Sequence, residues 1–370
     1  MIAIDTIEIY RVRVPLVYPF RTAYGSDDAV ESVLVRMASG SLAGWGEAQP
    51  FSLPAYSPEY SAGVYRTITD VLARGLVGQR IAGGEDLQAR MACFKGNYFA
   101  KAALDMAWWD LAARQQGLPL WKVLGGVRDV VEVGADFGVM ESLDALLGKI
   151  DEAVRAGFAR VKLKYAPDWD LAMVAEVRRS FPKLVFHIDC NSAYTLADLP
   201  MFRELDRFGL AMIEQPLMHD DLIDHATLQK QIATPICLDE SITSANKARK
   251  AIEIGACRWV NIKPVRVGGL TEALRIHDLC AAAGVPCWVG GMLETAVGAA
   301  HCMAMATLTN IRYPSDIFPS SRFFAKDLGR PEIALSGPSR VTLPTSVGLG
   351  AKPDEEMLGR CTVEHARLSG

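Results

Sequence analysis

Lysine and carboxylate residues recur at an almost constant interval along the middle of this chain. Lys164, Asp189, Glu214, Asp239 and Lys263 are separated by 25, 25, 25 and 24 residues, and each closes a short apolar run. An apolar run of that length is typical of a buried parallel strand, and the interval to the next run accommodates one helix and two short loops. A βα unit repeated at this period predicts a barrel, in which the carboxyl ends of the strands meet at one mouth. The five charges are therefore expected to converge on one cavity.

Further apolar runs and amphipathic stretches complete the predicted barrel. The first strand is expected at residues 131–137, the seventh at 285–290 and the eighth at 310–316. Helices are expected between the strands, at residues 142–156, 170–180, 196–208, 222–230, 244–254 and 270–283. The pattern therefore predicts an α/β fold built on a closed barrel of parallel strands.

A second domain is expected in front of the barrel. Residues 1–50 show mostly the alternating, β-branched patterns of strands, interrupted by an aromatic and polar loop at 19–25, and residues 61–124 have helical patterns. A chain of 370 residues is too long for one compact core. We therefore expect an α+β domain at residues 1–125, the barrel at 126–325, and at 326–370 a Pro- and Gly-rich segment that returns to the first domain.

Composition narrows the class of protein. The net charge of −4 supplies no basic stripe for nucleic acid and no polybasic patch for a membrane. The amino terminus lacks a basic flank, so no signal peptide is expected, and the most apolar region, 279–308, is broken by glycines, a proline and Glu294. Eight cysteines without a CxxC pair indicate a reducing, cytoplasmic location. The expected partner is therefore a small molecule.

The three carboxylates predict a metal site. Asp189, Glu214 and Asp239 end three successive predicted strands, and three such groups at one mouth repel one another unless a cation lies among them. Ligation by oxygen alone suits a hard cation, so Mg²⁺ is favoured, with Mn²⁺ as the second choice. The alternative for each acid by itself is a helix cap or an ion pair. Three acids at one spacing favour the metal site.

Three lysines flank these carboxylates in the predicted barrel. Lys162 and Lys164 are two residues apart on one strand and point to the same side, while Lys263 lies beyond the strands that carry the acids. Partial desolvation and a nearby cation are expected to lower a lysine pKa, which makes a neutral amine available as a base. One lysine could then remove the proton α to a metal-bound carboxylate, and the opposite lysine could return one. The competing interpretation is a neutral network of lysines and acids.

Short motifs around these residues resemble the enolase superfamily, muconate-lactonizing subgroup. They are Lys-x-Lys at 162–164, Asp-x-Asn at 189–191, Glu-Gln-Pro at 214–216, Asp-Glu-Ser at 239–241 and Asn-Ile-Lys-Pro at 261–264. Stretches at 56–60, 263–269, 290–295 and 316–322 are similar to the branch of o-succinylbenzoate synthases and N-succinylamino acid racemases. The resemblance covers nearly the whole chain. It implies an α+β capping domain over a (β/α)7β modified TIM barrel.

The resemblance also implies roles for individual residues. Lys164 would be the base on one face of a carboxylate substrate, Lys263 would act on the other face, and Lys162 would assist through its charge. Arg266 falls where racemase-competent members of the branch carry an arginine. Further candidates for substrate contact are Asn191, Gly291, Met292 and the loop aromatics Phe20 and Tyr56, which could cover the cavity. The branch usually forms homo-oligomers, and its synthase reaction belongs to menaquinone biosynthesis.

Several activities remain open at this level. Synthase and racemase share the lysines, the metal and the fold, and a muconate cycloisomerase needs the same lysines. Dipeptide epimerases of this type carry Asp-x-Asp after strand eight, where this chain has Asp316-Ile317-Phe318. A Schiff-base aldolase would use one lysine as a nucleophile but would not need three carboxylates. A non-catalytic binding protein would not need lysines on both faces.

One residue departs from the pattern of the branch. Asp136, near the end of the first predicted strand, stands where the branch tends to have a small hydroxyl residue. An acid at this position either pairs with Lys162 or Lys164 or alters the choice of substrate. The sequence leaves both interpretations open.

Overall fold

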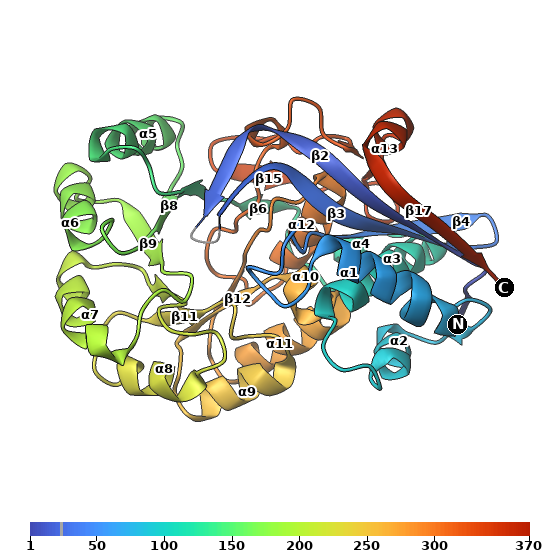
Figure 1. Ribbon diagram of the computed structural model, residues 1–370, viewed down its shortest axis with the longest axis horizontal. Coiled ribbons are helices and arrows are strands. Elements are labelled where there is room, and N and C mark those ends of the chain that lie inside the picture. The colour runs from blue at the N-terminus through green and yellow to red at the C-terminus, as the bar shows by residue number, and fades with distance from the viewer. Residues whose placement is uncertain (23–24) are drawn as a thin grey trace.

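A barrel of parallel strands and an antiparallel sheet lie side by side in this protein (Figure 1). The computed structural model describes residues 1–22 and 25–370, and it describes side chains outside residues 20–26. Helices between residues 143 and 282 surround the barrel strands on the left of Figure 1, and both ends of the chain lie at the antiparallel sheet on the right.

Seven parallel strands make the barrel sheet, in the order β7-β8-β9-β10-β11-β12-β13. Their bounds are β7 (Ala135–Phe137), β8 (Arg160–Lys164), β9 (Val185–Asp189), β10 (Ile213–Glu214), β11 (Ile236–Leu238), β12 (Trp259–Ile262) and β13 (Cys287–Val289). Residues 310–316, predicted as an eighth strand, close the barrel through isolated parallel bridges at Ile311 and Ser315. Pro314 lies between these bridges and has no N–H group to donate, so a continuous ladder does not form there.

The first predicted strand, residues 131–137, is two strands in the structure. β6 (Val130–Glu132) pairs in antiparallel fashion with β15 (Arg340–Thr342), and only β7 joins the barrel. Gly134 stands between β6 and β7, and a Cβ atom there would lie 2.2 Å from the guanidinium carbon of Arg160. The break therefore lets the backbone pass closely over a buried arginine.

The outer helices follow the predicted intervals closely, with one exception. They are α5 (Leu143–Arg155), α6 (Leu171–Ser180), α8 (Leu222–Gln229), α9 (Ala245–Glu253) and α11 (Leu270–Ala282). The hydroxyls of Ser142 and Ser244 accept hydrogen bonds from backbone N–H groups three residues further on, which fixes where two of the helices begin. The predicted helix at 196–208 is a shorter helix, α7 (Leu199–Leu205), with a 3₁₀ turn at each end. The barrel half also contains α10 (Pro264–Val267) and α12 (Ala296–Ala306), which lie outside the predicted intervals.

Four antiparallel strands in the order β17-β2-β3-β4 form the second sheet. They are β2 (Thr6–Thr22), β3 (Gly25–Ser39), β4 (Leu42–Ala48) and β17 (Thr362–Ser369), so the end of the chain returns to the first domain. The hairpin of β2 and β3 is longer than predicted and takes in most of the expected loop at 19–25, because pairing resumes after an irregularity beyond Pro15. The remaining elements are β1 (Ile2–Ala3), α1 (Ser61–Thr67), a π turn (Ile68–Leu72), a 3₁₀ turn (Ala73–Gly75), β5 (Arg80–Ile81), α2 (Gly84–Met91), α3 (Tyr98–Gln116), α4 (Leu120–Val123), a 3₁₀ turn (Ser320–Arg322), β14 (Gly329–Arg330), β16 (Lys352–Pro353) and α13 (Glu355–Cys361).

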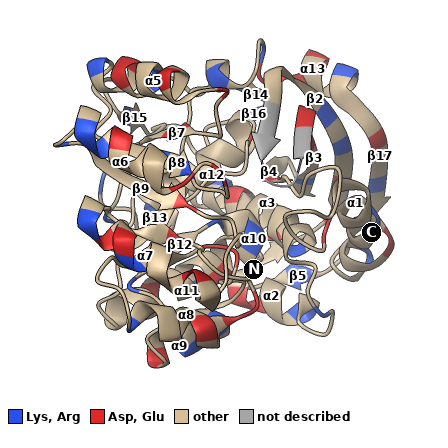
Figure 2. Ribbon diagram, turned by 60° about the vertical axis from the view of Figure 1, so that its left-hand side comes forward, with Lys and Arg blue, Asp and Glu red and all other residues tan. Residues whose placement is uncertain are grey.

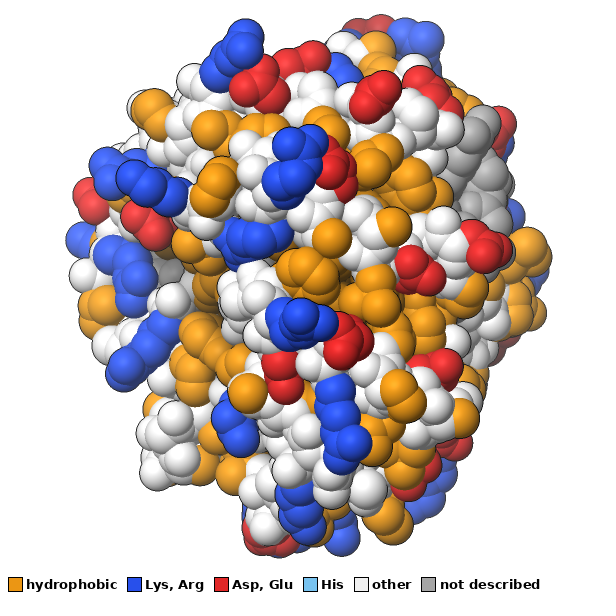
Figure 3. Space-filling view, turned by 90° about the vertical axis from the view of Figure 1, so that its left-hand side faces the viewer, with side chains coloured by type: hydrophobic (Ala, Val, Ile, Leu, Met, Phe, Trp, Pro, Cys, Tyr) orange, Lys and Arg blue, Asp and Glu red, His pale blue; other side chains and the backbone are white. Residues whose placement is uncertain are grey.

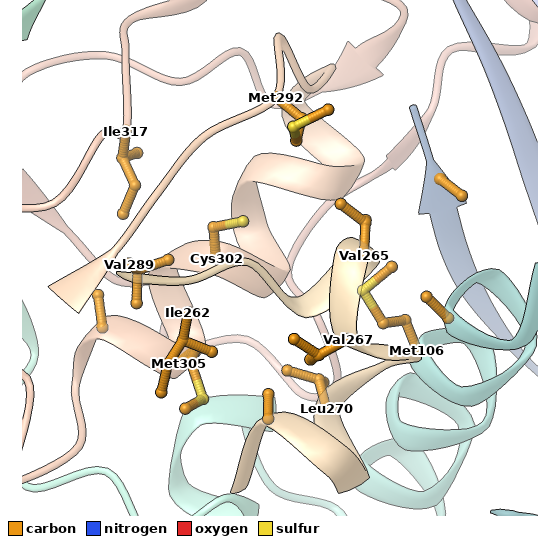
Figure 4. Packing of buried hydrophobic residues seen from close by; sticks show 14 of the residues in the cluster. Met106, Ile262, Val265, Val267, Leu270, Val289, Met292, Cys302, Met305 and Ile317 are labelled. Carbon is orange, nitrogen blue, oxygen red and sulfur yellow. The ribbon is translucent and has the colours of Figure 1, made fainter. Parts of the chain in front are cut away.

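Helix α3 joins the two halves of the molecule. Its Asp105 is fully buried and accepts hydrogen bonds from the backbone N–H and the hydroxyl of Thr271, at 3.0 and 2.6 Å. Gly269 makes this contact possible, because a Cβ atom there would lie 2.4 Å from the Cβ of Asp105. Figure 4 shows Met106, the next residue of α3, near Val265 and Val267 of α10. The two halves therefore share one continuous hydrophobic core.

The surface carries charges of both signs. Figure 2 shows lysine and arginine close to aspartate and glutamate along the outer helices, and the face in Figure 3 has basic and acidic side chains interspersed with hydrophobic ones. Within the described ranges, the helices are too short or too polar for any of them to span a membrane.

Candidate active site

The carboxylates of Asp189, Glu214 and Asp239 lie on neighbouring strands at one end of the barrel. Asp189 and Glu214 end β9 and β10 and are opposite one another in the parallel ladder. Cys237 is the partner of Glu214 in β11, and because side chains alternate along a strand, Asp239 points to the same side as Cys237. All three acids are at most 1% exposed.

Buried amides hold this group of acids in place. The side-chain amide of Asn261 donates to Oε1 of Glu214 at 2.7 Å. The side-chain oxygen of Gln215 accepts hydrogen bonds from the backbone N–H groups of Asp239 and Ser241, at 3.0 and 3.1 Å. Gln215 itself has a φ of +38°, so backbone strain is concentrated where β10 ends. The orientation of two of the acids is therefore set by side chains with no exposed surface.

Lys162 lies between two of the carboxylates. Its Nζ is 2.9 Å from Asp189 and 2.8 Å from Glu214, and its side chain is 3% exposed. Burial alone lowers the pKa of Lys162, but the charges of Asp189 and Glu214 raise it well above its ordinary value. Burial likewise raises the pKa of Asp189, and the two lysines beside it lower it further than burial raises it. For Lys162 the nearby acids therefore outweigh the effect of desolvation on the pKa.

Lys164 and Lys263 stand on opposite sides of the acids. Lys164 ends β8 and its Nζ donates to Asp189 at 2.7 Å, whereas Lys263 follows β12 and its Nζ donates to Asp239 at 2.9 Å. The strands that carry the acids lie between β8 and β12 in the sheet. Burial lowers the pKa of Lys263, but acidic groups around it, Tyr56 first, raise it above its ordinary value. In this arrangement the charges of the lysines and of the acids neutralise one another.

One cavity brings the lysines together with residues from the capping domain. Its lining consists of Phe51, Tyr56, Asp136, Lys162, Lys164, Asn191, Lys263, Gly291, Met292, Leu293, Asp316, Phe318 and Phe323. Asn191, Gly291, Met292 and Tyr56 were among the predicted substrate contacts. The cavity holds only ≈ 60 Å³, whereas sites for small molecules usually have about 300–1,000 Å³. A substrate must therefore displace the side chains that now reach into this space.

Tyr56 forms the contact between the capping domain and the catalytic end of the barrel. The Nζ of Lys263 donates to its hydroxyl at 3.3 Å and lies 5.1 Å from the centre of its ring. Phe51, from the same connection between β4 and α1, packs edge-on against Tyr56. Phe20, the other predicted aromatic cover, has its side chain outside the described residues. The capping domain therefore supplies part of the wall beside Lys263.

Of Arg266, Gly290 and Gly291, only Gly291 lines the cavity. The guanidinium of Arg266 binds the carboxylate of Asp239 and donates to the carbonyl oxygen of Asn261 at 2.7 Å, and Arg266 is not among the residues that line this cavity. A Cβ atom at Gly290 would lie 2.4 Å from Oδ1 of Asn261, so this glycine is needed for packing. Arg266 is therefore placed to position an acid.

Asp316 is a site residue that the sequence analysis did not select. It accepts a hydrogen bond from Arg160 at 2.8 Å, lies 3.5 Å from the Nζ of Lys162, and lines the cavity. Burial raises its pKa, but the charges of Arg160 and Lys162 lower it to about 2. Asp316 closes the eighth predicted barrel segment, so the rule that selected the other acids could have found it. The aromatic lining at Phe318 and Phe323 follows in the same loop.

The chemistry of the acids fits a hard divalent cation. Asp189, Glu214 and Asp239 offer only oxygen donors, all buried and on adjacent strand ends. Oε2 of Glu214 is enclosed and, although it is paired in charge with Lys162, it accepts no well-directed hydrogen bond. In the described part of the chain, no three acid, histidine or cysteine side chains already form a metal cage. A cation would therefore have to replace the ammonium groups that now neutralise these acids.

The fold and the site define an α/β-barrel protein with a capping domain and three buried carboxylates between two lysines. Two family descriptions match: mandelate racemase / muconate lactonizing enzyme, N-terminal domain, over residues 4–125, and enolase C-terminal domain-like, over residues 145–357. The chain belongs to the enolase superfamily, in its mandelate racemase and muconate lactonizing group.

Relatives extend the match over the full length. The chain is 43% identical over 362 residues to an o-succinylbenzoate synthase of Geobacillus kaustophilus, which covers 98% of this chain and 96% of the relative. It is 42% identical over 366 residues to an N-succinylamino acid racemase of Thermus thermophilus, with 99% of each covered. A solved structure of an enolase superfamily member from Listeria innocua superposes with a TM-score of 0.96 over 100% of both chains, at 36% identity. A dipeptide epimerase from Cytophaga hutchinsonii, solved with Mg and a dipeptide, superposes with a TM-score of 0.90 over 100% of both chains, at 26% identity.

Proposed function

We propose that this protein is a Mg²⁺-dependent enzyme that removes the proton α to a carboxylate. Its reaction is racemisation of N-succinylamino acids, formation of o-succinylbenzoate by loss of water, or both at one site. The observation that carries this proposal is the pair Lys164 and Lys263, which face one cavity from opposite sides of three buried carboxylates. Relatives with both names at 42% and 43% identity support it.

The residues of the site divide into metal ligands and proton carriers. Asp189, Glu214 and Asp239 would hold one Mg²⁺, with Mn²⁺ as a substitute, and the bound cation would polarise the carboxylate of the substrate. Lys164 and Lys263 are placed to remove or deliver a proton at the α-carbon from opposite faces. Removal of the α-proton from one face and its return on the other invert the configuration of the α-carbon, so the two enantiomers interconvert.

Dehydration needs fewer of these groups. Lys164 alone would act as base, and Lys263 would stabilise the developing anion through its charge. Lys162, already held between two of the acids, would contribute positive charge where the substrate carboxylate binds. Both reactions begin with the same proton removal, so one site can support both. We place the enzyme in the cytoplasm as a homo-oligomer, and in menaquinone biosynthesis where the synthase reaction predominates.

Activity assays on purified protein with Mg²⁺ test this proposal. Exchange of the α-proton with solvent deuterium, followed by proton NMR, reports on a panel of N-succinylated hydrophobic amino acids, and absorbance reports on formation of o-succinylbenzoate. At least one of the two should proceed. A protein that is folded and loaded with Mg²⁺ but performs neither reaction would contradict the proposal, and muconate-type cycloisomerisation would then be the activity to assay.

Arg266→Gln separates the two reactions. Arg266 binds Asp239, which in turn is bound by Lys263, so the substitution should disturb the Lys263 side of the site more than the Lys164 side. Racemisation should therefore lose more activity than dehydration. Arg258→Gln is a matched control, because Arg258 is exposed and lies at the opposite end of β12. Equal losses of both reactions in Arg266→Gln would contradict this assignment.

A further inference from the structure

Asp136 is an acid in the cavity lining that the proposed mechanism does not use. It lies in the middle of β7, directly opposite Lys162 in the parallel ladder, and it lines the same cavity as Lys162 and Lys164. Its position beside both lysines is the reason that an ion pair with one of them was an open interpretation of the sequence.

The structure does not pair Asp136 with either lysine. Lys162 lies within 3.0 Å of Asp189 and Glu214, and Lys164 donates to Asp189 and Asn191. Within the described ranges, the ion pairs of these lysines do not include Asp136. Oδ1 of Asp136 is enclosed and has no hydrogen-bond partner there. Asp136 therefore lines the cavity while one of its carboxylate oxygens has no hydrogen-bond donor.

The cationic side chain of Arg322 contacts the backbone of Asp136 and two aromatic rings. The guanidinium of Arg322 donates to the backbone carbonyl oxygen of Asp136 and lies 4.6 Å from the centre of the Phe318 ring and 5.4 Å from that of Phe323. These rings line the cavity next to Asp136 and already hold one planar cation. The surroundings of Asp136 are therefore suited to a second positive group supplied by a ligand.

Burying a carboxylate oxygen without a hydrogen-bond donor is unfavourable in free energy, and a ligand that supplies the donor removes this penalty. The acyl end of an N-succinylamino acid is itself a carboxylate, which Asp136 would repel. The amino acid side chain is thus the part of the substrate that can approach this acid. Since the three cavity lysines already serve other carboxylates, a full positive charge on that side chain balances Asp136 best.

We infer that Asp136 determines specificity for N-acylamino acids whose side chain ends in an ammonium or guanidinium group. The inference rests on the proposed racemase function and names the substrate class of the same site. A charged hydrogen bond of this kind contributes about 1.5–3 kcal/mol, which corresponds to a preference of about 10- to 150-fold.

Matched substrates test the inference directly. N-succinyl-lysine and N-succinyl-norleucine differ by the terminal ammonium group, and both are assayed with wild type, Asp136→Asn and Asp136→Ser. The ratio of kcat/KM for the lysine substrate over the norleucine substrate should exceed about tenfold in wild type and fall at least tenfold in both variants, chiefly through KM. Glu152→Gln, which removes an exposed acid on α5, should keep the wild-type ratio.

Two results would overturn the inference. A wild type without preference for the lysine substrate is one, and an equal loss for both substrates in the variants is the other, because it would assign Asp136 to Lys162 or to the fold. Calorimetric binding of the same two compounds to the Mg²⁺-loaded protein measures the preference without turnover. Failure of the proposed function would appear as no turnover of either compound, while the binding ratio still decides the role of Asp136.

Discussion

Replacing Asp316 by asparagine should lower the thermal stability of this enzyme by several degrees. Asp316 is 4% exposed and accepts a hydrogen bond from Arg160, which is 0% exposed. Asparagine keeps the shape but leaves the buried guanidinium without its counter-charge, and breaking a buried pair in this way costs about 3–5 kcal/mol. An unfolding entropy of about 2.1 cal/mol/K per residue amounts to about 0.8 kcal/mol/K for this chain, so Tm should fall by about 4–6 °C.

The pKa of Asp316 gives a second estimate of the same interaction. The folded value of about 2 lies below the ordinary 3.8, so the ionised acid stabilises the fold above about pH 4, and this contribution is lost as the pH falls through 2. At about 1.4 kcal/mol per pKa unit, the contribution is on the order of 2 kcal/mol, comparable to the cost of breaking a buried pair.

Calorimetry at pH 7.5 on Asp316→Asn, Arg160→Met and the double variant isolates the pair. Arg160 also lies over the rings of Trp288 and Tyr313. Arg160→Met removes these ring contacts both in wild type and in Asp316→Asn, so their contribution cancels in the double-mutant cycle. Arg160→Met should therefore cost at least about 1 kcal/mol less in the Asp316→Asn background than in wild type. Single effects that add within about 0.5 kcal/mol would refute the reasoning.

Three further results are expected. Gly269→Ala should destabilise the fold by about 1–3 kcal/mol more than Gly268→Ala in urea unfolding. Both glycines have a positive φ, but only a Cβ atom at Gly269 would collide with Asp105, so equal costs would contradict this explanation. Burial raises the pKa of Glu294 to about 7, above its ordinary 4.5, so between pH 4.5 and 7 the unfolded chain binds fewer protons, and stability should fall by up to about 3 kcal/mol as pH rises. Burial also raises the pKa of Asp105 to about 6, so Glu294→Gln should make the decline shallower without removing it, and parallel profiles would contradict the assignment. A chelator should abolish activity and Mg²⁺ or Mn²⁺ should restore it, and full activity without metal would refute the metal site. Glu214→Gln should weaken Mg²⁺ binding measured by calorimetry while the circular dichroism spectrum stays unchanged.

The repeat of βα units was readable from the sequence because a strand end recurs wherever the chain returns to the barrel mouth. Lys164, Asp189 and Glu214 end their strands as the period predicted. The split of the first strand was not readable, since it depends on the contact of Gly134 with Arg160, which belongs to another strand. The local sequence pattern was therefore sufficient to predict the barrel, whereas departures from it, such as the split first strand, depend on contacts between residues far apart in the chain.

The charge state and partners of the site residues depend on distances that spacing does not contain. Spacing did not show that burial lowers the pKa of Lys162 while two acids within 3.0 Å of its Nζ raise it by more. Likewise, Asp136 is opposite Lys162 in the ladder, yet the lysine turns toward other carboxylates. Residue types and strand positions thus identified the participants, while the three-dimensional packing determined which of them interact.

The most direct test of the central claim is the stereospecificity of α-proton exchange in lysine variants. Each enantiomer of an N-succinylamino acid that wild type racemises is incubated in D₂O with wild type, Lys164→Ala or Lys263→Ala, and loss of the α-proton signal is followed by NMR. Because the two lysines face the α-carbon from opposite sides, each variant should lose exchange of one enantiomer far more than of the other, and the affected enantiomer should differ between the two variants. Equal exchange of both enantiomers in either variant would contradict the assignment of Lys164 and Lys263 to opposite faces.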